Sequence, residues 1–269
     1  MKETKIGSYR WTICSLLFFA MTVNYVDRQV ISLLKPILSK EFNWNESDYA
    51  NVVIAFQLGY ALGMLGAGRI IDKIGTKIGY ALSLILWSIV AILQAAAKGT
   101  LGLGIIRFFL GVTEAGNFPA AIKAAAEWFP KRERALATGI FNTGTTAGAI
   151  IAPLTAPWIA IHYGWQMAFI ITGAIGLLWL LFWFRIYEIP SKHKKLSKAE
   201  YDYIHMDNEE LPAGSEKENA PKIPWIKLLT YKQTWAFMVG KFFTDGVWWF
   251  FLFWLPAFLT QEYKLVGVE

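Results

Sequence analysis

The amino-acid sequence predicts an all-α integral membrane protein with seven membrane-spanning helices. Hydrophobic residues make up 55% of its 269 residues and charged residues only 17%, whereas an ordinary soluble domain has about 45–50% and about 25%. The apolar residues form long runs, and the stretches 50–68, 78–97 and 135–184 contain no Asp, Glu, Lys or Arg. Runs of about 20 apolar residues match the hydrocarbon core of a bilayer. These observations exclude a soluble enzyme, a nucleic-acid-binding protein and a disordered chain.

The seven expected spans follow the apolar runs in order. The first is too long for the apolar region of a secretory signal, and no small-residue cleavage site follows it, so we expect it to remain in the protein. The connections between the first six spans are short, which predicts that these helices are sequential antiparallel neighbours. The expected spans are residues 11–34, 50–71, 78–97, 101–126, 135–161, 167–187 and 235–260.

A polar stretch divides the chain into three expected regions. Residues 1–187 are predicted to form a six-helix transmembrane bundle, and residues 188–234 a charged linker. Residues 235–269 contain the seventh span, which we expect to begin an incomplete second bundle. Because this span has no partner of its own beyond the linker, the chain is expected to be an N-terminal fragment.

The distribution of lysine and arginine predicts the orientation of the chain in the membrane. Fourteen of these residues lie in the N-terminus, in 69–77, in 131–134 and in 185–198, and the opposite loops hold only Lys35, Lys40 and Lys98. Cytoplasmic loops of membrane proteins carry the excess of basic residues. The N-terminus and the linker are therefore predicted to be cytoplasmic, in a multi-pass protein of the cell inner (plasma) membrane, and the net charge of +6 needs no nucleic-acid partner.

Two adjacent charged residues, Asp27 and Arg28, occur within the first span. Ionisable groups inside a span are costly and are therefore candidates for function. Neighbouring helical side chains point about 100° apart, so the two need not neutralise each other. The alternative is that both lie at the outer interface and extend their charged ends into water, but the span continues apolar as far as Leu34.

The fourth span carries Arg107, Gly111 and Glu114 on one helical face. The two charged residues are separated by about 10 Å along the axis, and Gly111 removes bulk between them. One interpretation is a structural ion pair within the bundle. The other is a carboxylate that binds and releases a proton beside an arginine that fixes an anion.

Polar residues of the second and fifth spans are candidates for contacts to a ligand, and glycines in the same spans favour close helix packing. These polar residues include Tyr60, Asn142 and Thr145. One interpretation is that they form interhelical hydrogen bonds, and the other is that they line a water-filled cavity and bind the hydroxyl groups of a ligand. Pro153 and Pro157 predict a kink in the fifth span. In the seventh span the aromatic run 248–254 is too long for an interfacial belt alone.

An intramembrane enzyme is the competing class, and the residues do not favour it. Such an enzyme needs a metal cluster, or a nucleophile with a base, among its helices. His162, His193 and His205 are expected in loops, and the one thiol, Cys14, lies in an apolar helix where it is expected to pack. We therefore expect neither an enzyme, nor a cofactor, nor a bound metal.

Several motifs resemble the major facilitator superfamily. The segment between the second and third spans, GRIIDKIGTK at 68–77, is similar to its signature loop and contains Gly68, Asp72, Gly75 and Lys77. Two further segments resemble the anion:cation symporter family, namely NYVDR at 24–28 and RFFLGVTEA at 107–115 followed by Pro119 and Ala120. The sequence WWFFLFWLP at 248–256 is similar to the hexuronate, or sugar-acid, branch, and the resemblance covers about residues 9–263.

The resemblance implies a twelve-helix transporter of two six-helix halves. This chain then supplies the major facilitator N-terminal six-helix bundle and the first helix of the C-terminal half, and it needs the missing C-terminal half for transport. Superfamily members bind substrate between the halves near the bilayer midplane. The implied function is a proton-coupled symporter for a sugar acid, a hexuronate such as glucuronate or galacturonate, whose partners are a small organic anion, protons and the lipid bilayer.

The matching motifs also imply roles for single residues. Asp27 and Glu114 would bind protons, Arg28 would hold the substrate carboxylate, and Arg107 would act as the charge partner of Glu114. The sugar hydroxyls would contact Tyr25, Tyr60, Asn142 and Thr145, and the loop with Gly68, Asp72, Gly75 and Lys77 would act in gating.

Two departures from the family pattern affect the expected substrate. Thr145 stands where galactonate-transporting relatives tend to carry glutamine, which favours a hexuronate over an aldonate. Asp245 is followed by Gly246, where hexuronate relatives are expected to have proline. The alternatives are a symporter for another organic anion, such as an aldonate, an aldarate or another carboxylate, and a truncated remnant that does not transport.

Overall fold

The computed structural model describes residues 6–207 and 225–263, and all regular secondary structure in these residues is helical. This confirms the predicted all-α class. The helices are α1 (Tyr9–Leu33), α2 (Lys35–Glu41), α3 (Glu46–Ile74), α4 (Thr76–Leu93), η1 (Gln94–Ala96), α5 (Thr100–Glu114), α6 (Asn117–Trp128), α7 (Lys131–Tyr163), α8 (Trp165–Ile186), η2 (Pro190–Lys192), α9 (Lys198–His205), α10 (Trp225–Leu228), α11 (Lys232–Phe253) and α12 (Leu255–Tyr263).

Five helices in the described part of the chain are long and apolar enough to cross a membrane. They are α3, α4 with η1, α7, α8 and α11, and the protein is accordingly a multi-pass membrane protein. Helix α5 has only 15 residues. Helix α1 has 25 residues, but its second half carries the buried polar side chains of Asn24, Asp27 and Arg28. Most of α1 is enclosed by protein, so fewer of its side chains need to be apolar for contact with lipid.

Two of the expected spans are each divided into two helices. The fourth, 101–126, consists of α5 and α6, with Ala115 and Gly116 between them, and the seventh, 235–260, consists of α11 and α12, with Trp254 between them. A proline lies within the first turn of the second helix in both cases, Pro119 in α6 and Pro256 in α12. Proline has no N–H to donate to the preceding turn, which favours a break just before it.

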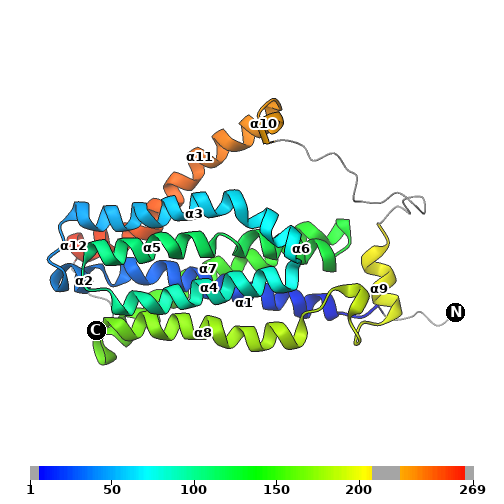
Figure 1. Ribbon diagram of the computed structural model, residues 1–269, viewed down its shortest axis with the longest axis horizontal. Coiled ribbons are helices and arrows are strands. Elements are labelled where there is room, and N and C mark those ends of the chain that lie inside the picture. Colours follow the sequence, from blue (N-terminus) through cyan, green and yellow to red (C-terminus); the bar gives the residue numbers. More distant parts are fainter. Residues whose placement is uncertain (1–5, 208–224, 264–269) are drawn as a thin grey trace.

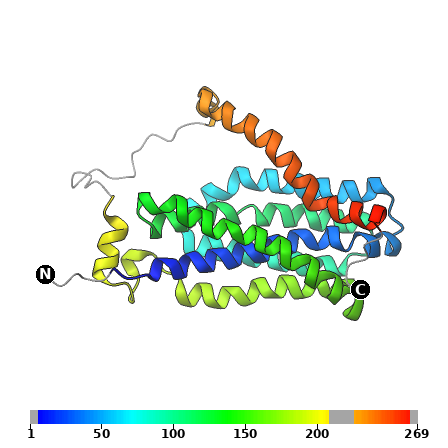
Figure 2. The ribbon, with the colours of Figure 1, turned by 180° about the vertical axis from the view of Figure 1, so that it is seen from behind.

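The expectation that sequential spans would be the principal neighbours is wrong. The most extensive contacts join α1 to α7, α3 to α5 and α4 to α8. Figures 1 and 2 show these helices side by side in one bundle, with α9 at the end where the N-terminus lies and α2 and α12 at the other end. Short connections therefore fix the direction of each helix but not its packing partner.

Glycines allow these three pairs of helices to approach closely. A Cβ atom at Gly59 of α3 would lie 2.0 Å from the carbonyl oxygen of Phe108 in α5. At Gly144 of α7 it would lie 2.3 Å from the carbonyl oxygen of Phe18 in α1, and at Gly173 of α8 2.8 Å from that of Ser88 in α4. Small residues at membrane helix contacts let the backbones meet.

The histidines do not all lie in loops as expected, and the predicted kink at the two prolines stays a prediction. His162 is in the last turn of α7 and His205 in the last turn of α9, and His193 lies between η2 and α9. Pro153 and Pro157 are both inside α7, which continues as one helix from Lys131 to Tyr163.

Replacing Gly59 by alanine is expected to destabilise the protein. The new methyl group would collide with the backbone of α5, and overpacking of this kind costs about 1–3 kcal/mol. Gly66→Ala is the matched control, since it lies on the same helix and no atom would be within 4 Å of its Cβ. Thermal unfolding in detergent micelles measures both. Equal melting temperatures for the two variants would contradict the close packing of α3 against α5.

Candidate functional site

Four charged side chains are buried together in the bundle. Asp27 and Arg28 are on α1, Arg107 and Glu114 are on α5, and each residue is no more than 3% exposed. The alternative in which Asp27 and Arg28 lie at the outer interface is therefore wrong. The two positive and two negative charges sum to zero, which limits the cost of holding them away from water.

Glu114 is paired with Arg28. The Nε atom of Arg28 lies 2.6 Å from Oε2 of Glu114. Asn24 is buried one turn before Arg28, and its Nδ2 has no hydrogen-bond partner within the described residues. Arg107 contributes to the electrostatic environment of Glu114 but makes no ion pair with it in the described residues. Because Arg107 and Glu114 are two turns apart on one helix, the arginine of the facing helix reaches the carboxylate more directly.

Asp27 and Arg107 are buried without a completed set of hydrogen bonds. Within the described part of the chain, neither oxygen of Asp27 and no nitrogen of the Arg107 guanidinium has a partner at hydrogen-bonding geometry. The charges of Glu114 and Arg107 nevertheless contribute to the electrostatic environment of Asp27. Incompletely paired buried charges are expensive. Their presence favours a site that binds and releases ligands over a purely structural pair.

Aromatic rings surround the Arg28 guanidinium. Its central carbon lies 4.4 Å from the ring centroid of Tyr60, 5.1 Å from that of Tyr25 and 5.6 Å from that of Phe56. The structure thus brings the predicted Tyr25 and Tyr60 to Arg28. Phe56 and Asn24 were not predicted. Each lies one turn before a predicted residue, Tyr60 and Arg28 respectively, and that spacing was the available signal.

Asn142 and Thr145 are not part of the charged cluster. Asn142 is exposed on α7, and the Thr145 hydroxyl donates to the Asn142 carbonyl within the same helix. The backbone of α7 at Gly148 nevertheless lies against Tyr25. The helix that carries Asn142 and Thr145 therefore passes beside the site.

The predicted gating residues lie at the junction of α3 and α4. Gly68 is within α3, and Gly75, with a φ of 85°, is the single residue between the two helices. A positive φ is accessible to glycine at little cost, which explains the residue type at this tight turn.

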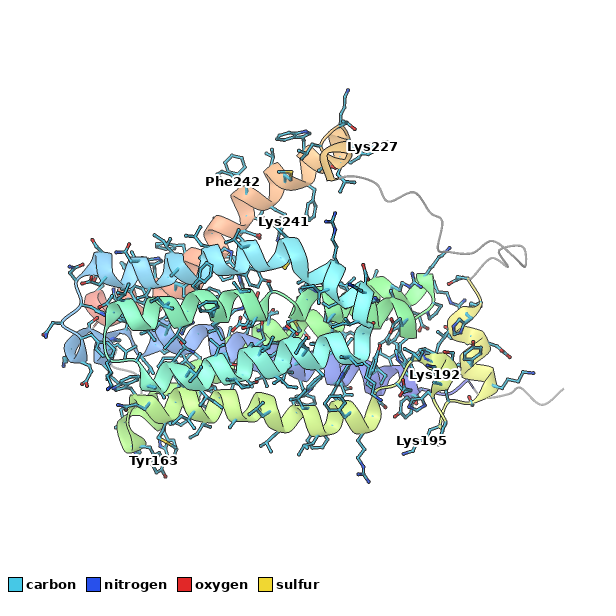
Figure 3. All side chains as sticks on the ribbon, in the orientation of Figure 1. Tyr163, Lys192, Lys195, Lys227, Lys241 and Phe242 are labelled. Carbon is cyan, nitrogen blue, oxygen red and sulfur yellow. The ribbon has the colours of Figure 1, made fainter. Side chains whose placement is uncertain are left out.

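Two ion pairs hold this junction. Asp72 Oδ1 lies 2.8 Å from Lys123 Nζ of α6, and Lys77 Nζ lies 2.8 Å from Oε2 of Glu188, beyond the end of α8. The hydrogen bond from Lys77 lowers the pKa of the Glu188 carboxyl, so this pair remains formed at neutral pH. Two basic residues of the expected linker, Lys192 and Lys195, project from the same end of the bundle (Figure 3).

Comparison with known proteins identifies the family of this chain. The family model described as Major Facilitator Superfamily matches residues 17–268. A galacturonate transporter of Dickeya chrysanthemi is 34% identical over 96% of this chain and 74% of its own length. A hexuronate transporter of Escherichia coli (strain K12) is also 34% identical, over 96% of this chain and 59% of its own length. A D-galactonate transporter of Escherichia coli O6:H1 is 32% identical over the whole chain and 64% of its own length.

A solved structure has a similar fold. It is a bacterial homologue of the human lysosomal transporter Spinster, in an inward-facing and unoccupied conformation, with a TM-score of 0.71 and 22% sequence identity. The match covers 98% of this chain and 58% of that one. The chain thus spans about three fifths of the length of several relatives that it matches.

Replacing Arg28 by methionine is expected to lower the free energy of unfolding by about 3–5 kcal/mol, because Glu114 would remain buried and unpaired. Arg28→Met combined with Glu114→Leu should recover most of this loss, since no isolated charge remains. Lys123→Met is the control, because its partner Asp72 is 73% exposed and surface pairs contribute about 0–1 kcal/mol. Urea titration in micelles is the measurement, and additive losses in the double variant would contradict the pairing.

Proposed function

The chain belongs to the Major Facilitator Superfamily, and from this premise we propose that it is part of a proton-coupled symporter that takes up a hexuronate such as glucuronate or galacturonate. The buried Arg28–Glu114 pair, set in a neutral cluster of four charges, carries the proposal. The relatives named as galacturonate and hexuronate transporters support the choice of substrate.

The ion pair couples the substrate to a proton. Arg28 is bound to Glu114 through its Nε atom. A proton that adds to the Glu114 carboxylate removes its negative charge and leaves the guanidinium free to bind the carboxylate of the substrate through two hydrogen bonds. The cluster is again neutral once the substrate is bound. Because an unbalanced buried charge is costly, the proton and the anion favour each other's binding.

A second proton makes uptake electrically favourable. Moving one charge across the membrane changes the free energy by about 2.3 kcal/mol per 100 mV. One proton cancels the charge of a monoanion that enters a negative-inside cell, and a second proton makes the net charge that enters positive. Asp27 lies close enough to Glu114 and Arg107 to interact with both charges. We assign it the second proton, and Arg107 the role of a fixed positive charge that balances the Asp27 carboxylate until that proton binds.

The uncharged residues form the remainder of the proposed site. Tyr25 and Tyr60 adjoin Arg28 and are suited to contact the hydroxyl groups of a sugar acid bound there. Asn142 and Thr145 remain proposed contacts from α7. An aldonate, aldarate or other carboxylate is the alternative substrate, and the similarity to a D-galactonate transporter favours testing it.

We also propose the topology that this function requires. The N-terminus and residues 188–234 are on the cytoplasmic side of the inner membrane, with the junction of Gly68, Asp72, Gly75 and Lys77 acting as a gate on that side. Residues 1–187 form one helical half and α11 begins the other. Alternating access places the substrate between two such halves, so transport requires a complete second half.

Glu114→Gln is expected to exchange substrate across the membrane but not to accumulate it. Glutamine resembles the protonated carboxyl and frees Arg28, yet it has no proton to release. Counterflow and uptake driven by a pH gradient separate the two activities. Both are measured with labelled glucuronate and galacturonate in proteoliposomes that contain the complete transporter, including its second half. Asp245→Asn, a change in a more exposed carboxylate of α11, is the control. If Glu114→Gln still concentrates substrate, Glu114 is not the coupling residue.

Arg28→Lys is expected to weaken substrate binding by roughly 10- to 150-fold. Lysine keeps the charge but loses the planar fork that binds a carboxylate through two hydrogen bonds, which costs about 1.5–3 kcal/mol, at about 1.4 kcal/mol per tenfold change. The apparent KM for uptake measures this loss of substrate affinity. Arg185→Lys, at an exposed position near the end of α8, should leave it unchanged, and equal KM values for the two variants would contradict the role of Arg28.

A further inference from the structure

Helix α11 contacts the rest of the bundle through its C-terminal half. Phe237, Phe242 and Phe243 in its first half are between 69% and 77% exposed, whereas Leu252 and Phe253 near its end are buried. Figures 1 and 2 show the beginning of α11, next to α10, standing away from the bundle while its end lies against it. Phe242 and Lys241 lie on the part that stands away (Figure 3).

The end of α11 is attached to α2 and α3 by polar and aromatic contacts. The Tyr49 hydroxyl donates a 2.8 Å hydrogen bond to the carbonyl oxygen of Phe253. The last carbonyls of a helix lack donors within the helix, so the break at Trp254 leaves this one available. The Lys35 ammonium lies 4.8 Å from the Tyr49 ring and 5.3 Å from the Trp254 ring.

This attachment holds Trp249 over the substrate arginine. The Trp249 ring stacks on Phe253, one turn later, with centroids 5.6 Å apart. The guanidinium carbon of Arg28 is 5.7 Å from the Trp249 ring, whose centroid lies 6.4 Å from that of Tyr60. Rings within about 6 Å of a guanidinium attract it through their π faces.

Four rings therefore enclose Arg28, and we name Tyr25, Phe56, Tyr60 and Trp249 the aromatic cage. Three of its members come from α1 and α3, which belong to the predicted six-helix bundle. Trp249 comes from α11, on the far side of the linker. Movement of α11 would open the cage at this ring alone.

We infer that Trp249 is a positioning residue for Arg28, through which the position of α11 determines how firmly the arginine is held for its anion. The inference rests on the proposed function for the identity of that anion. The four rings of the cage border the guanidinium while its Nε is bound to Glu114. A guanidinium that is already held in position loses less conformational freedom when it binds a carboxylate. Without Trp249, we expect the Arg28 guanidinium to be mobile and uncovered.

The first test does not depend on any substrate. Purified protein in detergent is treated with phenylglyoxal, which modifies arginine, and the modification of Arg28 is followed by mass spectrometry. Trp249→Leu should accelerate it at least fivefold, and Trp249→Phe, which keeps an aromatic face, should restore most of the protection. Phe250→Leu is the matched control, because Phe250 is the next residue and is 55% exposed.

A second variant keeps this test decisive if Trp249→Leu folds poorly. Tyr49→Phe removes only the hydroxyl that binds the Phe253 carbonyl and should accelerate the modification of Arg28 by a smaller factor. Arg107, which is equally buried on α5, is the internal reference and should stay protected in every variant. Unchanged reactivity of Arg28 in both variants, or a parallel rise at Arg107, would overturn the inference.

The transport measurement separates this inference from the proposed function. In proteoliposomes that contain the complete transporter with its second half, Trp249→Leu should raise the apparent KM for the hexuronate about tenfold with a much smaller change in the maximal rate, and Trp249→Phe should restore it. A complete wild-type transporter that transports no sugar acid would refute the proposed function but leave the result at Arg28 intact. If Trp249→Leu makes Arg28 reactive to phenylglyoxal but leaves the KM unchanged, the positioning role is refuted and the proposed function is not.

Discussion

The packing of the bundle depends on holding two arginines and two carboxylates in an interior that is closed to solvent. Each of Asp27, Arg28, Arg107 and Glu114 would be expensive alone, and together they are neutral. Among these four, only Arg28 and Glu114 form an ion pair. Asp27, Arg107 and the other oxygen of Glu114 have no hydrogen-bond partners within the described residues, which supports the proposal that the cluster binds a proton and an anion.

Close contacts between the helices place the four charged residues together in the interior. Gly111 lies between Arg107 and Glu114, and a Cβ there would lie 2.2 Å from the carbonyl oxygen of Phe56. The absence of a side chain lets α3 approach α5 until Phe56 and Tyr60 reach Arg28. The glycines of α7 bring that helix against α1 in the same way. Close backbone packing and the position of the charged cluster are therefore one feature of the bundle.

The two ends of the molecule are held by different contacts. At the end near α9, Arg10 bonds both Glu133 of α7 and Glu200 of α9, and the α3–α4 junction is paired to α6 and to Glu188. At the other end, Tyr49 and Lys35 bind the last turn of α11 and the residue after it. The first half of α11 stands away from the bundle. Helix α11 therefore contacts the bundle at its end near α12 and is separated from it at its beginning near α10.

The sequence by itself determined which segments are apolar helices, and that ionisable residues lie within the first and fourth of them. Hydropathy and helical spacing are local properties of the sequence. They therefore identified Asp27, Arg28, Arg107 and Glu114 without knowledge of the fold. They did not determine that α1 packs against α7, that Glu114 is bound by Arg28, or that Trp249 joins the ring cage. Those contacts depend on how distant helices are rotated and how closely glycines let them approach. Only the tertiary structure decides this, because each contact joins residues that the order of the chain keeps far apart.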